Sequence, residues 1–328
     1  MEKLYPLKFK PIFKNKIWGG QKIKTILEKD FSPLMNCGEL WAISGVEDEQ
    51  SEVENGFLEG NELNELVEVY MGDLVGEKVF KKYGNVFPVL IKFIDTNAYL
   101  SLQVHPDDKL AMKNHGENFG KNEMWYIIEA EHGADLISGF SKKVTKDEFA
   151  KILENKMVEE VLNFEKVSEG DVYDIPAGRI HAIGPGILLA EIQQTSDITY
   201  RISDWDRIDV DGTKRELHTE LALEALNFDV EENYKNSYRS KLNEPAVLVE
   251  NQYFKTNIIE FDKKLDFENT LLDSFVIHVC IDGEYTLTSA DNEPLTIKKG
   301  ESVLIPAELN IYEITPVSSA KILEVYIN

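Results

Sequence analysis

The chain has 328 residues, of which 59 are acidic and 35 are basic, so its formal net charge is −24. Its hydrophobic content of 43% is typical of a globular protein with a large core, and the net charge argues against a nucleic-acid partner, which would need a basic surface. No apolar run resembles a signal peptide or reaches the length of a membrane span. Because the chain has only two cysteines, Cys37 and Cys280, far apart in sequence, we expect both to be reduced and the protein to be cytoplasmic.

The first hundred residues predict strands interrupted by one helical region. Residues 4–13 are expected to be extended, because two prolines exclude a helix there. Gly38–Ser44 alternates like a strand with one buried face, and residues 87–94 form a nearly continuous apolar strand. Between them, residues 63–83 have the apolar spacing of short helices, with an interruption near Gly72.

The next strand, at residues 99–105, carries two polar side chains on one face. Strand side chains alternate, so Gln103 and His105 must point the same way. The strand ends at a proline, after which Asp107 or Asp108 is expected to cap a short helix.

The next part of the chain predicts a strand, a helix and then a hairpin. Glu123–Ile128 is a strand that begins with a carboxylate, and residues 146–162 have helical spacing. Residues 170–181 predict a strand, a tight turn at Pro176–Gly178, and a second strand that opens with His181. The region that follows, to residue 201, alternates polar and apolar groups in the way typical of the wall of a small-molecule site.

The remaining chain predicts a second β-domain. Residues 227–243 are polar and charged, which indicates a crossing between domains. Beyond it we expect short strands with turns at Asp282–Gly283 and Lys299–Gly300. Gly300–Ala307 aligns without gaps on Gly170–Ala177, a pattern that favours an internal repeat.

In the second copy of this repeat, Ile311 stands where the first copy has His181. The prediction is therefore a mainly β protein with two β-domains of the same kind. Residues 1–240 would form the metal-binding domain, with short helical segments, and residues 241–328 a degenerate copy without metal.

Four side chains form a candidate metal site: Gln103, His105, Glu123 and His181. Histidine nitrogens with a carboxylate and an amide oxygen suit zinc, or another divalent first-row metal, in an open site. Each residue alone is more often structural, but together they favour a ligand set. His105, Asp107 and His181 offer an alternative, the two-histidine, one-carboxylate pattern of iron oxygenases.

The other histidines have no comparable partners and are interpreted as structural or surface residues: His115, His132, His218 and His278.

Several motifs carry a resemblance to a known family. Gly170-x5-Pro176-x-Gly178-x2-His181 resembles the second sequence motif of the cupin superfamily, which implies that the two domains are cupin-type β-barrels (jelly rolls). More narrowly, the chain resembles the type I mannose-6-phosphate isomerases, also called phosphomannose isomerases, in their short bacterial form. The matching segments are Trp18–Gly20, Gly38–Trp41, Gln103–Asp108, Lys121–Tyr126, Ile175–Ile183 and Glu191–Arg201.

The resemblance implies a set of site residues and a cofactor. It places the zinc ligands of the family on Gln103, His105, Glu123 and His181, which implies one Zn²⁺ per chain in the first domain. Its catalytic arginine falls on Arg201, and a lysine proposed to act near the substrate falls on Lys121. Nothing functional carries over to the C-terminal third of the chain.

The implied reaction interconverts mannose 6-phosphate and fructose 6-phosphate through an enediol, and it needs a base and local cations. Lys121 and Glu191 are both candidates for the base. Arg201 and Lys121, with Arg179 or Arg207, could supply the positive charge. Two alternatives stay open: an isomerase of another hexose 6-phosphate, and a metal-containing sugar-binding cupin without turnover.

Overall fold

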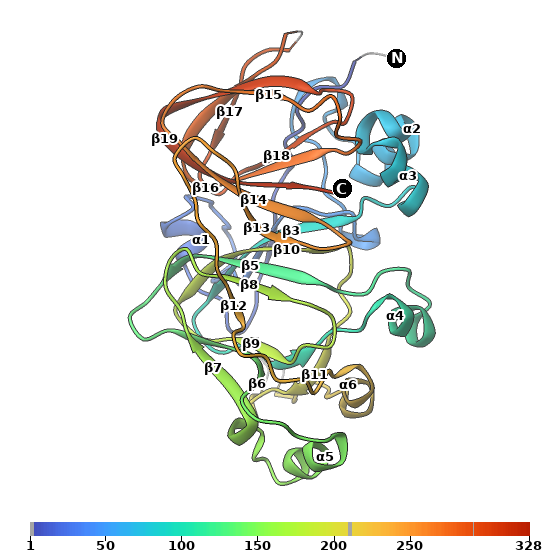
Figure 1. Cartoon of the computed structure of the whole chain (residues 1–328), viewed down its shortest axis with the longest axis vertical. Coiled ribbons are helices and arrows are strands. Elements are labelled where there is room, and N and C mark those ends of the chain that lie inside the picture. The colour runs from blue at the N-terminus through green and yellow to red at the C-terminus, as the bar shows by residue number, and fades with distance from the viewer. Residues whose placement is uncertain (1–2, 209–211, 291) are drawn as a thin grey trace.

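Three antiparallel sheets build the protein, and the computed structural model describes residues 3–208, 212–290 and 292–328 of it (Figure 1). The first sheet has the order β1 (Ile12–Lys14), β2 (Glu39–Ile43), β3 (Val89–Thr96), β10 (Ile187–Gln194), β5 (Glu123–Ala130), β8 (Val172–Ile175), β12 (Lys235–Asn236). The second has the order β11 (Tyr200–Ser203), β4 (Leu102–Val104), β9 (His181–Ile183), β6 (Asp135–Phe140), β7 (Leu162–Lys166).

The third sheet belongs to the C-terminal part of the chain. Its order is β13 (Ala246–Glu250), β14 (Lys255–Phe261), β19 (Ile311–Tyr326), β16 (Val276–Thr288), β17 (Leu295–Lys298), with β15 (Leu265–Glu268) on β19 and β18 (Ser302–Ile305) on β16. The prediction of a mainly β protein is confirmed by these sheets.

The first sheet is the middle layer of the molecule, between the second sheet below and the third above (Figure 1). On one face, Trp125 packs in a core with Ile183 of the second sheet. On the other face, Ile192 shares a core with Leu323 of the third sheet. A strand buried on both faces needs apolar residues throughout, which explains the continuous apolar run that predicted β3.

The helices lie along the edges of the sheets: α1 (Lys22–Thr25), α2 (Leu63–Val75), α3 (Glu77–Tyr83), α4 (Asp108–His115), α5 (Lys146–Glu154) and α6 (Thr219–Ala225). The interruption predicted near Gly72 is confirmed, since Met71 has a non-helical φ of 46°. Asp107 caps α4 by accepting a hydrogen bond from the N–H of Leu110. None of the helices in the described ranges has the length and apolar character needed to cross a membrane.

Two local predictions are wrong in their extent. The helix predicted at residues 146–162 ends at Glu154 and is followed by a 3₁₀ turn, Val158–Val161, because Lys156 adopts a φ of 57°. Of the strand predicted at residues 99–105, only Leu102–Val104 (β4) form a strand.

The turn predicted at Asp282–Gly283 is also wrong, because both residues lie inside β16. The pairing of β16 with β19 shifts register on either side of them, which marks a bulge. Gly283 has a φ of 76°, and a Cβ there would lie 2.2 Å from the carbonyl oxygen of Ser319. Glycine is needed at this bulge for the same reason that it is needed in a turn, so the residue pair alone could not distinguish the two.

The internal repeat has a structural counterpart. β8 begins two residues after Gly170 and β9 eleven residues after it; β18 and β19 begin at the same offsets from Gly300. Both glycines have positive φ, 86° and 78°. His278, predicted to be structural, is buried in the third sheet between the hydroxyls of Tyr285 and Tyr312.

The two predicted domains are in close contact. Leu7 exchanges two backbone hydrogen bonds with Leu304, so the N-terminal segment reaches the third sheet. The polar segment predicted as a crossing includes β12, which pairs with β8 of the first sheet. The domain boundary near residue 240 stays a prediction.

Candidate metal centre and active site

His105, Glu123 and His181 meet between the first and second sheets. His105 follows β4 and His181 opens β9, both of the second sheet, whereas Glu123 opens β5 of the first sheet. All three side chains are buried, and their ligand atoms lie within 4.8 Å of one another. Gln103 is the register partner of His181, and its amide nitrogen lies 3.2 Å from Nε2 of that histidine. The structure thus brings together all four predicted ligands.

The cluster fits a metal ion. Both carboxylate oxygens of Glu123 are buried; Oε1 has no hydrogen-bond partner, and Oε2 has only the ion pair with Lys121. Nδ1 of His105 lies 3.0 Å from the carbonyl of Ile198, and Nδ1 of His181 lies 2.8 Å from the carbonyl of Arg179, so both rings direct Nε2 toward Glu123, at 3.5 Å. Histidine ligands of metals are oriented in this way, through the ring nitrogen that does not bind the ion.

The protonation states also suit a metal. Burial and the charge of Lys121 lower the pKa of His105 to about 3, and burial lowers the pKa of His181, so both rings are neutral at pH 7. For Glu123, burial opposes ionisation, but the nearby charge of Lys121 holds its pKa well below the usual value. Neutral imidazoles with an ionised carboxylate are the forms that bind zinc.

The alternative iron site is not formed, because Asp107 is used as the cap of α4 and is not part of the cluster. Lys121 is part of the site: its ammonium lies 2.8 Å from Oε2 of Glu123 and 3.0 Å from Nε2 of His105.

A cavity of about 170 Å³ adjoins the cluster, and Gln103 and Lys121 are in its wall. Five cationic and three anionic side chains line it, which gives a local excess of positive charge in a strongly acidic chain. These charged residues are Lys16, Lys92, Lys121, Arg201, Arg215, Glu39, Glu191 and Asp197.

Glu191 is held rigidly in this wall. Trp125 donates a hydrogen bond from Nε1 to its carboxylate at 2.9 Å, and the ammonium of Lys92 lies 3.3 Å away. All three residues are register partners on neighbouring strands of the first sheet. Burial and the charge of Glu123 raise the pKa of Glu191, and Lys92 acts in the opposite direction. A carboxylate with a raised pKa is a better general base near neutral pH.

Arg201 lines the cavity from β11, where its register partner is Gln103. Its Nη1 donates to the carbonyl of Glu216 at 2.8 Å, while its Nε is buried without a hydrogen-bond acceptor. The ion pairs of Asp204 go to Arg207 and Arg215. Arg201 is therefore a wall residue of the cavity, as predicted.

Sequence reasoning assigned no site role to five charged wall residues: Lys16, Glu39, Lys92, Asp197 and Arg215. Lys92 had a visible signal, because it is the one charged residue in the apolar run at 87–94. Glu39 lay in a recognised motif without an assigned role, and Arg215 had no local signal. Arg179, considered as a source of charge, pairs instead with Glu231.

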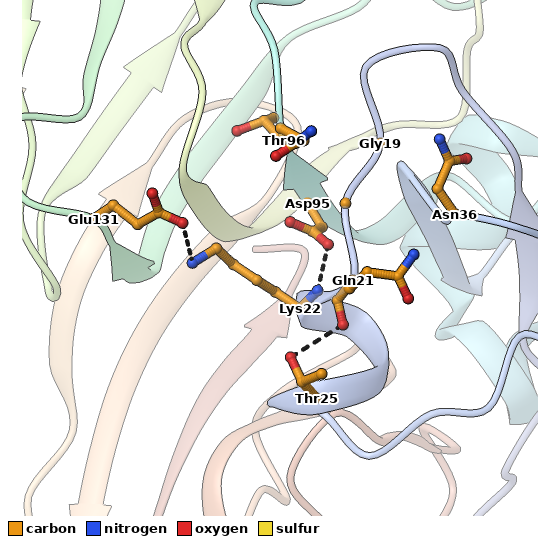
Figure 2. A pocket seen from close by; sticks show the side chains of 10 residues that line it. Gly19, Gln21, Lys22, Thr25, Asn36, Asp95, Thr96 and Glu131 are labelled. Carbon is orange, nitrogen blue, oxygen red and sulfur yellow. Dashed lines mark hydrogen bonds and ion pairs between the residues drawn. The ribbon is translucent and has the colours of Figure 1, made fainter.

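A larger pocket, of about 400 Å³, has none of the four candidate ligands in its wall (Figure 2). Its wall includes Gly19 and Gly20, which continue the loop from Trp18, a wall residue of the cavity. The buried carboxylate of Asp95 accepts a hydrogen bond from the N–H of Lys22 at 2.6 Å, and a Cβ on Gly20 would lie 2.5 Å from it. Asp95 thus holds the start of α1 and the loop that precedes it.

Asp95 predicts a pH-dependent stability difference. Burial raises its pKa from 3.8 to about 6, so ionised Asp95 disfavours the folded state above pH 6, and this cost is lost as the pH falls toward 4. Asp95→Asn keeps an acceptor for the N–H of Lys22 but cannot ionise. The measured quantity is the free energy of unfolding of Asp95→Asn minus that of the parent protein. We expect this difference to be about 2 kcal/mol larger at pH 8 than at pH 4.5.

Urea unfolding at both pH values measures this difference, with Asp229→Asn, an exposed site, as the control. An equal effect of Asp95→Asn at pH 8 and pH 4.5 would contradict the assignment.

Comparisons with known proteins agree with the geometry. Residues 6–133 match the family model of the phosphomannose isomerase type I catalytic domain, and residues 245–327 match that of the mannose-6-phosphate isomerase cupin domain. Mannose-6-phosphate isomerase ManA of Bacillus subtilis is 33% identical over 94% of this chain and 95% of its own length. The enzyme of Streptococcus mutans is 33% identical over 94% of both chains.

Solved structures show the same fold. The mannose 6-phosphate isomerase of Bacillus subtilis superposes with a TM-score of 0.88 at 32% identity, over 98% of this chain and 99% of that one. A zinc-bound mannose 6-phosphate isomerase has a TM-score of 0.80 at 14% identity, over 98% of this chain and 99% of its own. With matches over nearly its whole length, the chain belongs to the type I phosphomannose isomerase family.

Proposed function

We propose that this protein interconverts mannose 6-phosphate and fructose 6-phosphate in the cavity beside the buried cluster, as a cytoplasmic enzyme. The observation that carries the proposal is the junction of two features: a buried His105–Glu123–His181 cluster and a cavity with excess positive charge in a chain of net charge −24. A phosphosugar carries negative charge near neutral pH, so such a cavity favours it over the rest of the acidic surface. The names of the curated relatives support the same substrate pair.

Gln103, His105, Glu123 and His181 would hold one zinc ion per chain. When bound, zinc polarises a carbonyl oxygen and stabilises the negative charge that develops on it. The zinc-bound relative of the same fold supports this choice of metal. The Gln103 amide is next to His181, and a flip of the amide group would present its oxygen instead of its nitrogen.

The isomerisation moves a proton between C1 and C2 of the sugar through an enediol. We assign Glu191 as the base, because Trp125 and Lys92 fix its carboxylate and its pKa is raised. Lys121 lies beside Glu123 and His105 in the wall of the cavity, and with zinc on those two ligands its ammonium would be available to donate a hydrogen bond to a substrate oxygen. Arg201 supplies a fixed positive charge for the enediolate.

A coupled assay of each hexose 6-phosphate in anaerobic buffer tests the function. We expect formation of fructose 6-phosphate from mannose 6-phosphate, at a kcat/KM at least about 100-fold above that for glucose 6-phosphate. Preference for another epimer would support the alternative isomerase. Tight binding without turnover would support a sugar-binding cupin, and a requirement for oxygen would contradict an isomerase.

A further inference from the structure

Three arginines gather around one buried carboxylate at the edge of the cavity. Asp204 is 6% exposed and accepts hydrogen bonds from Nε of Arg215 at 2.9 Å and from Nη2 of Arg207 at 2.5 Å. Arg201 and Arg215 line the same cavity, and burial and the charges of Arg215 and Arg207 lower the pKa of Arg201. Nε of Arg201 and Nε of Arg207 are buried without a hydrogen-bond acceptor. The carboxylate of Asp204 therefore pairs with two of the three guanidinium groups, and Arg201 has no ion pair with it.

This arrangement is held by a strained loop. Trp205 and Asp206, directly after Asp204, both have positive φ values of 56° and 54°, which disfavour side chains larger than glycine. Trp205 is fixed by a hydrogen bond from Nε1 to the carbonyl of Leu100 at 2.6 Å, and Asp206 pairs with Lys156 and Lys214. Backbone strain maintained by such contacts is concentrated at binding sites.

Like charges repel, so three guanidiniums placed together favour an anion that completes the set. Of the two arginines that pair with Asp204, Arg215 is the one that lines the cavity. Its bonds to Asp204 use Nε and Nη2, and these bonds leave Nη1 of Arg215 for a ligand. A guanidinium fixed by a buried carboxylate is preorganised, which lowers the entropic cost of binding.

We propose that Arg215, fixed by Asp204, binds the phosphate group of the substrate and sets the preference of the site for phosphorylated sugars. This inference rests on the proposed function. It separates two roles among the arginines of the wall: Arg201 acts on charge that develops at the reacting carbons, and Arg215 anchors the phosphate.

The test uses the zinc-loaded full chain. Arg215→Met should raise both the KM for mannose 6-phosphate and the inhibition constant of inorganic phosphate by about 10- to 100-fold, the range expected for a lost hydrogen bond between charged groups. Its kcat should fall by less than its KM rises. For Arg215→Lys, both constants should lie between those of the parent protein and those of Arg215→Met. Arg239→Met, which removes an exposed arginine, should change neither constant.

If Arg215→Met does not fold because Asp204 loses a partner, the double variant Asp204→Asn/Arg215→Met removes the unbalanced carboxylate. A folded variant with unchanged KM and phosphate inhibition would overturn the assignment, leaving an ion pair that only stabilises the loop. Calorimetric titration with inorganic phosphate separates this failure from failure of the proposed function. Phosphate binding that depends on Arg215 would support the anchor even in a protein without isomerase activity, whereas no binding to the parent protein would reject it.

Discussion

Replacing His105 or His181 by alanine is expected to remove bound metal and isomerase activity together, with the fold largely preserved. Each ring supplies one of the nitrogen ligands of a buried cluster, and the remaining groups cannot complete a zinc site. We expect activity to fall by at least about 1000-fold, since the Lewis acid is lost. Gln103→Ala should cost less, because a neutral amide is a weaker ligand.

Elemental analysis and the coupled assay measure both effects on the same samples. His132→Ala, at an exposed histidine, is the matched control and should keep one zinc per chain and full activity. Stoichiometric zinc in a folded His181→Ala protein would show that the ligand set is wrong.

Arg201→Lys should cause a strong loss of kcat with zinc content intact. Lysine keeps the charge but loses the planar fork of the guanidinium, and the interaction is expected to act mainly in the transition state. By analogy with other lost transition-state donors, kcat should fall by about 100- to 1000-fold with a modest change in KM.

Steady-state kinetics of Arg201→Lys and Arg201→Ala, beside elemental analysis, check this expectation. Arg239→Met again controls for the loss of one positive charge. Turnover by Arg201→Ala at the rate of the parent protein would remove Arg201 from the catalytic set, and a change confined to KM would make it a substrate anchor instead.

The ligand set was predictable because its signals are local. Gln103 and His105 share a strand face by simple alternation, and His181 follows a turn marked by proline and glycine. That the two sheets bring Glu123 to them came from the family resemblance, since nothing in the spacing alone fixes which strands face each other.

The charged wall of the cavity was less accessible to sequence reasoning. Arg215 lies in this wall, and Trp205, nearby in the chain, has a positive φ without a sequence signature, because a tryptophan rarely adopts that conformation. The bulge at Gly283 was taken for a turn for a related reason: one residue type permits both. Contacts that depend on long-range packing therefore had to come from the structure.

Mannose 6-phosphate turnover during removal and return of zinc tests the central claim most directly. The protein is stripped with a chelator, checked for retained fold by circular dichroism, and titrated with Zn²⁺ while fructose 6-phosphate formation is followed. We predict that activity is lost with the metal and returns in proportion to added zinc, with a break at one equivalent per chain. Full turnover by the metal-free protein, or no recovery with zinc in a folded protein, would contradict the account.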